Sequence, residues 1–522
     1  LGLVLLEQKQ YIEAEPYFYK AMTLDEFYFV AYMGLAMCYE KQRKIFKAKA
    51  CYEELLIRDP EHTAALIKFA KLSIKCGENM AGFNAFKKAL EVDPTDLNKL
   101  RFDLMIPSQY KDKKDLLAWR DRFEKNLDKW HQSGAEKDAL LAFGSTNFYS
   151  LYQGFNEVEI QRKTAELFET AIPEDKPLKK SNEKRIKIGV MGTFFYDQSV
   201  MHFYKNMLIQ LPKEFHLTII CPGLRKRDHI TKALQSRADQ WIETKNDLEE
   251  LRTVISDQSF DILIYPEIGM EPTPYVLAMS RLAPVQCVLM GNPVTTGIPT
   301  IDYYVGSEVF ESEAAANHYT ETLVQIPGFP VDYDRSETQI SKSRADLGLP
   351  EENNIYMCPM TLFKIHPDFD PVIAGILRQD PNGVVILFSY FGIEKGLMDR
   401  FKRLMPDVVD RIQFINPLPN ADFGNMMALV DVILETFPFG GGNTALQALS
   451  TGTPAVTMQT EFLRGRWLYG YYKYAGIDDL ITEFPEDYVT KCVQVATDKE
   501  YRQRLKDQII KCHPLWFNNR EG

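Results

Sequence analysis

Small and aromatic positions recur through the first hundred residues with a fixed spacing of 34. Small residues stand at Ala14, Ala48 and Gly82, and aromatic residues follow four positions later at Phe18, Tyr52 and Phe86. Two further columns keep this spacing: Ala21, Leu55 and Ala89, and Gly2, Ala36 and Ala70. A repeated small position lets two helices approach closely, and an aromatic side chain fills the gap beside it. We therefore predict a solenoid of paired helices over residues 1–100.

The pattern resembles tetratricopeptide repeats, with Pro60 and Pro94 closing two of them. Solenoids of this kind present a concave surface to extended polypeptides. We therefore expect the repeats to bind a polypeptide. Two alternatives stay open: a scaffold that only caps the next domain, and an unrelated helical bundle.

From Arg185 onward, short apolar runs alternate with helical stretches, such as those near 200–211 and 248–255. The expected strands are 186–192, 217–221, 261–265 and 285–290, then 354–358, 384–388, 412–414, 430–434 and 455–458. This alternation predicts parallel sheets. Two series joined near 328–343 predict two Rossmann-like lobes. Because ligands bind beyond the carboxyl ends of such strands, facing lobes would form a ligand-binding cleft.

We predict four domains or regions. They are the repeats (1–100), a helical linker region (101–182), an N-terminal lobe on the acceptor side (183–335) and a C-terminal lobe (336–522). Within the linker region, the aromatic-rich segment 143–155 is expected to pack between domains. The charged, proline-bearing segment 173–181 is expected to be a linker.

Composition narrows the function classes. The chain has 522 residues, 45% hydrophobic, and a net charge of −11, which disfavours non-specific binding to nucleic acid or anionic lipid. No apolar run approaches the ~18 residues of a membrane span, and no signal peptide is evident at Leu1. The eight cysteines form no C-x-x-C pair and lie apart from the histidines, so we expect reduced thiols and no zinc site. We therefore expect a cytoplasmic protein; the first residue is not Met, which suggests missing upstream sequence.

The strongest local motif is the run 437–444, Phe-Pro-Phe-Gly-Gly-Gly-Asn-Thr, directly after an expected strand. Glycines permit close backbone approach, and free N–H groups at the start of the following helix favour a phosphate. The motif lacks the lysine of a P-loop, which disfavours an NTPase of that class. The alternative is an ordinary capped loop.

Two further loops follow expected strands. Lys364 could neutralise a diphosphate leaving group, although a lone lysine is commonly a solvated surface residue. The loop 291–297, Gly-Asn-Pro-Val-Thr-Thr-Gly, would face the same cleft, although many loops of this type look similar.

Together, the segments 281–286, 291–303, 361–364 and 440–452 resemble glycosyltransferase family 41, which includes protein O-GlcNAc transferases and bacterial adhesin glucosyltransferases. The resemblance implies repeats followed by a two-lobed GT-B fold, and metal-free, inverting transfer from a UDP-sugar. It also implies nucleotide contacts, in the C-terminal lobe, from Lys364, Thr361, Leu418, Gly441, Gly442, Asn443 and Thr444.

The chain also departs from that family. Asn292 replaces a histidine of adhesin-type members, beside Pro293 and Thr295, and Gln447 stands where a carboxylate commonly binds the ribose. Gln198 replaces a histidine near the first strand, which leaves His202 as a candidate catalytic residue with Glu267. For His202 and Glu267 a purely structural role stays open.

We expect a protein glycosyltransferase that moves GlcNAc or a hexose to Ser/Thr or Asn side chains. It would need no cofactor or metal, and its partners would be a UDP-sugar, a polypeptide held by the repeats, and a second protein or copy of the chain through the repeats. The alternative is a weak or inactive transferase-like adaptor. A transferase for small-molecule or lipid acceptors is disfavoured by the repeats.

Overall fold

The structure is a computed structural model, and it describes residues 1–175, 177–181, 183–335, 340–390 and 392–519. Residues 336–339, within the predicted join of the two lobes, lie outside the described residues, as do 176 and 182 of the predicted linker region. The chain divides into two compact units. One comprises Leu1–Asn126 with Ser389–Arg403, and the other comprises Leu127–Phe388 with Leu404–Gly522.

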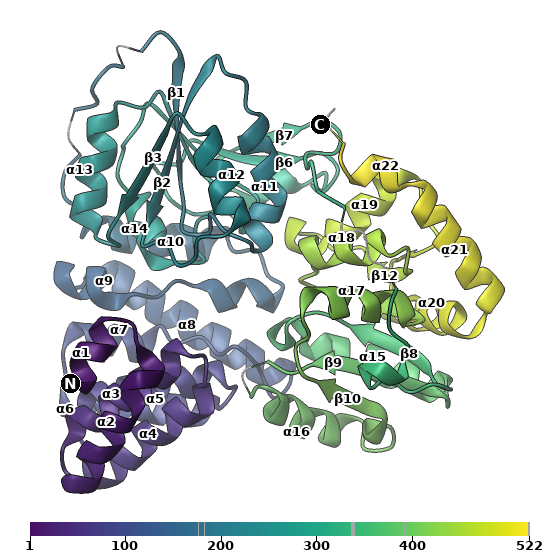
Figure 1. The fold of residues 1–522 in the computed structure, drawn as a ribbon, viewed down its shortest axis with the longest axis horizontal. Helices are drawn as coiled ribbons and strands as arrows, with labels where there is room; N and C mark the ends of the chain where they lie inside the picture. The colour runs from purple at the N-terminus through teal and green to yellow at the C-terminus, as the bar shows by residue number, and fades with distance from the viewer. Residues whose placement is uncertain (176, 182, 336–339, 391, 520–522) are drawn as a thin grey trace. The chain divides into compact units, whose positions relative to one another are not determined.

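The first unit begins with antiparallel pairs of helices, coloured purple in Figure 1. Consecutive helices pack along the chain. They are α1 (Gly2–Glu7), α2 (Tyr11–Leu24), α3 (Phe29–Lys41), α4 (Ile45–Arg58), α5 (Thr63–Lys75), α6 (Asn79–Val92) and α7 (Asp96–Asp103). The predicted solenoid is confirmed.

The small and aromatic columns form the core of these pairs. Phe18 and Tyr52 are buried, as are Ala14 and Ala48 beside them. A Cβ atom at Gly34 would collide with the Phe18 ring. The Phe18 ring therefore occupies space that only small residues on the neighbouring helices leave open, at Gly34 and at Gly2 of the repeated column.

The segment Ser389–Arg403 joins the first unit although the chain on both sides of it belongs to the second. It carries most of α16 (Glu394–Leu404). Its Arg400 is 1% exposed and donates a hydrogen bond of 3.1 Å to the carbonyl oxygen of Tyr110. A Cβ atom at Gly392, where φ is +84°, would collide with the Phe46 ring.

Four helical segments precede the first sheet: α8 (Lys113–Ser133), α9 (Lys137–Phe143), the 3-10 helix η1 (Phe148–Gln153) and α10 (Val158–Glu169). On η1, the Tyr152 ring stacks on Phe439 at 4.4 Å and contacts Phe363 at 4.8 Å, and it packs with Val294. Val294 follows the first sheet's β5 and the two phenylalanines belong to the second sheet's loops. The aromatic segment, which was expected to pack between domains, therefore contacts loops that follow strands of both sheets.

The first sheet has seven parallel strands in the order β3-β2-β1-β4-β5-β6-β7. The strands are β1 (Ile186–Met191), β2 (Phe215–Pro222), β3 (Gln240–Thr244), β4 (Ile262–Tyr265), β5 (Val285–Leu289), β6 (Tyr303–Ser307) and β7 (Thr322–Ile326). The sequence did not predict β3, β6 or β7. Strands β3 and β7 are edge strands with exposed or half-buried residues, so they lack a continuous apolar run.

The second sheet has six parallel strands in the order β10-β9-β8-β11-β12-β13. They are β8 (Asn354–Cys358), β9 (Gly383–Phe388), β10 (Ile412–Ile415), β11 (Val432–Leu434), β12 (Ala455–Met458) and the unpredicted two-residue β13 (Ile481–Thr482). Five of these strands are confirmed predictions.

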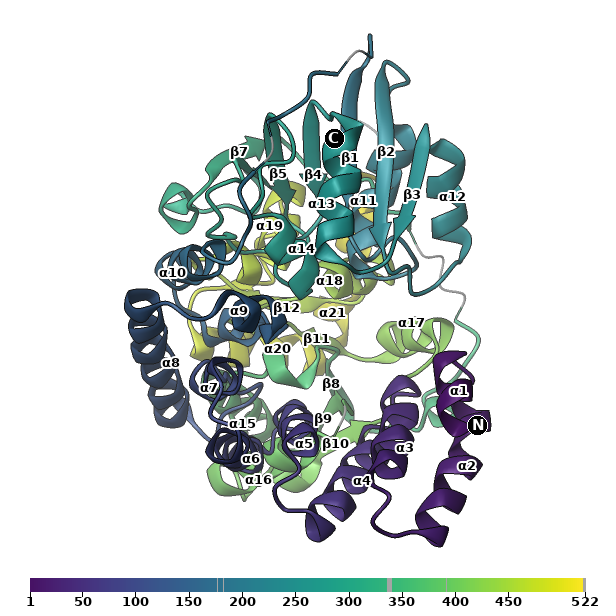
Figure 2. The same ribbon diagram turned by 90° about the vertical axis from the view of Figure 1, so that its left-hand side faces the viewer.

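Helices cover both faces of each sheet. Figure 1 shows α13 (Leu248–Gln258) on one face of the first sheet, with α11 (Ser199–Gln210) and α12 (His229–Arg237) on the other. Figure 2 shows the labelled strands of that sheet side by side from β7 to β3. The remaining helices are α14 (Pro272–Leu277), α15 (Asp370–Gln379), α17 (Asn420–Leu429), α18 (Gly442–Ser450), α19 (Trp467–Ala475), α20 (Pro485–Thr497), α21 (Lys499–Lys511) and α22 (His513–Trp516). The two parallel sheets with their helices match the predicted Rossmann-like lobes.

Over the described residues, no helix is both long enough and apolar enough to span a membrane. All eight cysteines are free, and six of them are buried.

Candidate functional site

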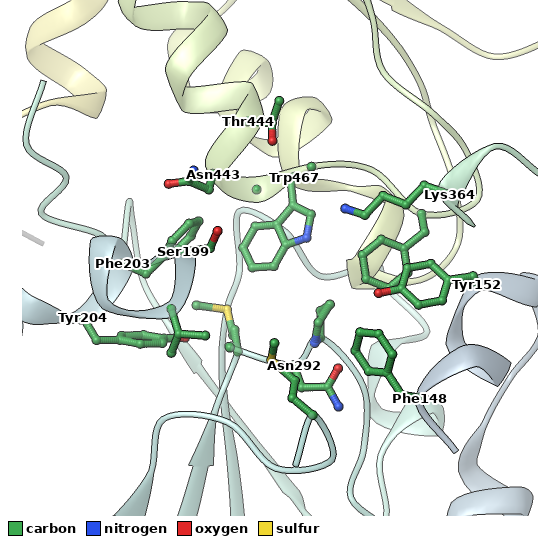
Figure 3. A pocket seen from close by; sticks show the side chains of 18 residues that line it. Phe148, Tyr152, Ser199, Phe203, Tyr204, Asn292, Lys364, Asn443, Thr444 and Trp467 are labelled. Carbon is green, nitrogen blue, oxygen red and sulfur yellow. The ribbon is translucent and has the colours of Figure 1, made fainter. Parts of the chain in front are cut away.

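A pocket of about 190 Å³ lies where loops from both sheets meet (Figure 3). It is lined by residues of η1, of α11, of the loops after β4 and β5, of the start of α18, and by Lys364 and Trp467. The predicted candidates among the lining residues are Lys364, Gly441, Gly442, Asn443, Thr444, Asn292 and Pro293. The fold therefore gathers loops from both lobes, as expected for ligands of open α/β sheets.

The start of α18 supplies backbone donors to the pocket. Gly441 is its N-cap residue and no side chain caps it. The amides of Gly442, Asn443 and Thr444 make no hydrogen bond within the part of the chain that the structure describes. Unpaired amides and the positive end of the helix dipole together favour an anion.

Glycines are required in the turn before α18 because other groups lie too close for a side chain. A Cβ atom would stand 2.6 Å from the Glu435 carboxylate at Gly440 and 2.6 Å from the Met360 sulfur at Gly441. At Gly442 it would stand 3.0 Å from the Phe203 ring. The glycine run therefore fits a tightly packed turn.

Glu435, which the sequence did not indicate, fixes this turn through a hydrogen bond to its backbone. It directly follows β11 and is 2% exposed. Its carboxylate accepts hydrogen bonds from the Gly441 amide at 3.2 Å and from the Thr457 hydroxyl at 2.5 Å. Burial raises the pKa of Glu435 to about 7. An acidic residue ending a buried strand was the only signal for it in the sequence.

Lys364 lies on the short 3-10 helix η4 (Leu362–Lys364), after β8. Its ammonium donates a hydrogen bond of 2.6 Å to the Gly440 carbonyl oxygen and lies 4.6 Å from the centre of the Phe439 ring. Burial lowers the pKa of this ammonium to about 8, while the Glu435 carboxylate acts in the opposite direction. The lysine is therefore no solvated surface residue, and its charge stands beside the helix N-terminus.

The first lobe contributes the opposite wall. The Asn292 side-chain amide donates a hydrogen bond of 2.7 Å to the Ile268 carbonyl oxygen, which ties together the loops after β5 and β4. Pro293 lines the pocket beside it. Thr295 does not line the pocket: its hydroxyl donates at 2.7 Å to the buried carboxylate of Glu321.

The two other catalytic candidates lie outside the pocket lining. His202 pairs with Asp197, Nε2 to Oδ1, at 2.7 Å. Glu267 is 1% exposed; one carboxylate oxygen accepts from the Met270 amide at 3.2 Å, and the other has no partner among the described residues. Burial raises the pKa of Glu267 to about 8. Neither His202 nor Glu267 lines the pocket itself.

Three nucleotide-binding candidates do not line the pocket. Thr361 precedes η4, and its buried hydroxyl has no partner among the described residues. Gln447 lies on α18, one turn beyond Asn443. Leu418 is half-buried in the loop between β10 and α17.

Arg464 and Arg466 follow β12, and both side chains are buried. Arg464 is 2% exposed and its guanidinium donates to the Phe155 carbonyl oxygen. Arg466 is 6% exposed and donates to the carbonyl oxygens of Phe310 and Thr460, both at 2.8 Å. Both arginines tie backbone segments together instead of facing water.

The sequence reasoning did not identify most of the pocket's aromatic and apolar lining. Nine lining residues come from separate elements outside the predicted motifs: Phe148, Tyr152, Val200, Phe203, Tyr204, Met270, Met290 and Trp467, together with the polar Ser199. Gly291 and Phe439 also line the pocket and lie within the predicted motifs 291–297 and 437–444. Only the aromatic richness of the segment before the first sheet pointed to Phe148 and Tyr152.

The arrangement combines a lysine, unpaired helix amides and an aromatic wall, which suits an anionic group carried on a larger organic ligand. No group of three or more His, Cys, Asp or Glu side chains able to hold a metal ion occurs in the described ranges.

Known proteins are similar to both the repeats and the C-terminal lobe. Residues 331–518 match the model of Glycosyl transferase family 41, and residues 30–62 match a tetratricopeptide repeat. The chain is 25% identical over 337 residues to the "Probable UDP-N-acetylglucosamine--peptide N-acetylglucosaminyltransferase SEC" of Arabidopsis thaliana, covering 62% of this chain and 34% of that protein. It is 24% identical over 352 residues to the "UDP-glucose:protein N-beta-glucosyltransferase" of Actinobacillus pleuropneumoniae serotype 5b, covering 64% and 54%.

A mutant of Thermobaculum terrenum O-GlcNAc transferase has a similar structure, with a TM-score of 0.71 and 18% identity, over 98% of this chain and 91% of that one. This likeness shows the fold. The chain spans about a third to a half of the length of the two curated relatives above. The chain therefore combines tetratricopeptide-like repeats with two parallel sheets in the GT-B arrangement, and its C-terminal lobe matches the model of Glycosyl transferase family 41.

Proposed function

We propose that this protein transfers a sugar from a UDP-sugar to a polypeptide side chain, with inversion and without a metal ion. One observation carries the proposal: the Lys364 ammonium and the unpaired amides of α18 face one pocket beside a first-lobe wall. The names of the relatives, one using UDP-N-acetylglucosamine and one UDP-glucose, support the class of donor.

The proposed chemistry is stabilisation of a leaving group. As the bond between the sugar and the diphosphate breaks, negative charge grows on the diphosphate oxygens. Lys364 and the amides of Gly442, Asn443 and Thr444 are already held in place, so they can stabilise this charge without reorganising. Inversion follows if the acceptor attacks the sugar from the side opposite the diphosphate.

The acceptor is proposed to enter from the first lobe, past Asn292. Both Ser/Thr hydroxyls and Asn amides suit the pocket, since no Asp, Glu or His stands among its described lining residues to select one of them. His202 and Glu267 lie outside that lining, so we propose supporting roles for them. The repeats are proposed to hold the polypeptide.

The experiment is a panel of UDP-sugars incubated with the protein and candidate polypeptides, with UDP release and the mass of the polypeptide measured together. UDP release that accompanies a hexose or N-acetylhexosamine mass gain supports the proposal. UDP release without any mass gain would indicate hydrolysis, and neither signal with any donor would contradict transfer.

A second candidate function is a binding adaptor that retains the nucleotide site without turnover. The observation that favours it is the state of Asn292, whose amide is engaged with the Ile268 carbonyl oxygen and has no charge to offer. Measurable UDP binding together with no UDP release from any donor would favour the adaptor.

A further inference from the structure

Tyr333 joins three elements behind the start of α18. It lies in the connection after β7 and is 3% exposed. Its hydroxyl donates a hydrogen bond of 2.5 Å to Oδ1 of Asn443. Its carbonyl oxygen accepts a hydrogen bond of 3.0 Å from the amide of Asn518, near the end of the described chain.

The surroundings of Tyr333 leave it little freedom. Its ring packs edge-on against Phe203 of α11, with ring centres 6.1 Å apart, and against Phe517, at 6.2 Å. The same connection is fastened to α11, since the Asn206 side chain donates at 2.9 Å to the Asp332 carbonyl oxygen. The phenol is therefore a fixed hydrogen-bond donor.

The orientation of the Asn443 amide determines whether a ligand in the pocket faces a hydrogen-bond donor or an acceptor. An asparagine side chain has an acceptor end, Oδ1, and a donor end, the Nδ2 group. Because the Tyr333 hydroxyl donates to Oδ1, the acceptor end is occupied. Nδ2 makes no hydrogen bond to the part of the chain that the structure describes, and Asn443 lines the pocket (Figure 3).

His202 stands on the other side of the same hydroxyl. Its Nδ1 atom lies 3.5 Å from the Tyr333 oxygen, a full ångström farther than Oδ1 of Asn443. The phenol proton therefore belongs to the bond with Asn443. The bond of His202 Nε2 to Asp197, at 2.7 Å, fixes the ring beside it.

We propose that Tyr333 is a positioning residue for the diphosphate: its hydroxyl holds the Asn443 amide so that the donor end serves the anion. This inference rests on the proposed function. Without the hydroxyl, the amide can turn and present Oδ1 to the phosphate oxygens, where two acceptors would repel each other. The sequence offers no motif for Tyr333, because its role arises from contacts across 110 residues.

The experiment compares the binding of UDP and of uridine by calorimetry. The variants are Tyr333→Phe, Asn443→Ala and the double variant, and thermal unfolding checks that each is folded. Tyr472→Phe is the matched control, because it also removes a buried hydroxyl of the second lobe, one that donates to the Ala455 carbonyl oxygen at 2.8 Å. Tyr472 does not line the pocket.

We expect Tyr333→Phe to weaken UDP binding by about five- to tenfold, the range for loss of one hydrogen bond, and to leave uridine binding unchanged. The double variant should bind UDP no more weakly than Asn443→Ala, and the control should bind both ligands normally. Equal weakening of UDP and uridine would indicate a general structural role and overturn the inference, as would unchanged UDP binding or fully additive losses. Absence of UDP binding by the unsubstituted protein would overturn the proposed function as well, so the two failures are distinguishable.

Discussion

The ammonium of Lys364 donates a hydrogen bond of 2.6 Å to the carbonyl oxygen of Gly440, across 76 residues of sequence. One of the three donors of the lysine thereby fixes its position, and the other two, which make no hydrogen bond to the described residues, can serve a ligand in the pocket that Lys364 lines. The same bond ties the loop after β8 to the turn before α18. Two features that the sequence offers separately, a lysine and a glycine run, thus form one anion site.

Glu435→Gln should make the alkaline limb of the activity–pH profile move to lower pH. Burial lowers the pKa of Lys364 to about 8, and the Glu435 carboxylate opposes this effect by favouring the charged ammonium. Removing that charge lowers the pKa further, so Lys364 loses its proton at a lower pH. The measurement is the rate of sugar transfer from pH 6 to 9. An unchanged alkaline limb would show that the two groups are not coupled.

Glu267→Gln should alter the pH dependence of stability. Burial raises the pKa of Glu267 from 4.5 to about 8 in the folded state, so the fold favours the protonated acid. The stability that this provides is complete below the unfolded pKa of 4.5 and is lost as the pH rises through 8. Thermal unfolding at several pH values should show that the stability of the variant increases relative to that of the unsubstituted protein as the pH rises. A constant difference across that range would contradict burial of the acid.

Gly34→Val should disturb the repeats and leave the nucleotide pocket alone. Any Cβ atom at this position collides with the Phe18 ring, so α2 and α3 must separate. Overpacking of this kind costs about 1–3 kcal/mol. Unfolding should begin at a lower temperature, transfer to polypeptide should fall, and the affinity for UDP should stay constant. Full transfer by a visibly destabilised variant would count against polypeptide recognition by the repeats.

Asn292→His combined with Gln447→Glu should change the rate of transfer. If the two amides merely replace a histidine and a carboxylate that support transfer more effectively, the double change raises activity on a common UDP-sugar. If they select another donor, it lowers activity on the true substrate. The rate with each donor of a panel distinguishes these outcomes, and no effect with any donor would place both residues outside the reacting centre.

The sequence predicted the parts of this fold that depend on local patterns. Continuous apolar runs identified the central strands, because a buried strand needs apolar side chains on both faces. The spacing of 34 identified the repeats, because each helix pair needs the same small and aromatic residues. The edge strands β3 and β7 were not predicted from the sequence, because an edge strand needs no continuous apolar run. The placement of Ser389–Arg403 with the repeats also escaped, because it depends on distant contacts such as that of Arg400 with Tyr110.

The candidate site divides in the same way. Lys364, Asn443 and Thr444 were identifiable because each follows a strand within a motif. Tyr333, Glu435 and Trp467 were not, because their positions near the pocket result from tertiary packing. Thr295 lies in a suggestive motif, yet the structure turns its hydroxyl toward Glu321.

The most direct test of the account is the turnover of Lys364→Ala with a UDP-sugar and a polypeptide acceptor. Loss of one held donor to the leaving group costs about 3–4 kcal/mol of transition-state stabilisation, or roughly a 10²–10³-fold fall in kcat. Lys395→Ala is the matched control, since that lysine side chain is 87% exposed on α16. The account predicts this fall for Lys364→Ala and normal turnover for Lys395→Ala. Unchanged turnover by a folded Lys364→Ala protein would contradict it.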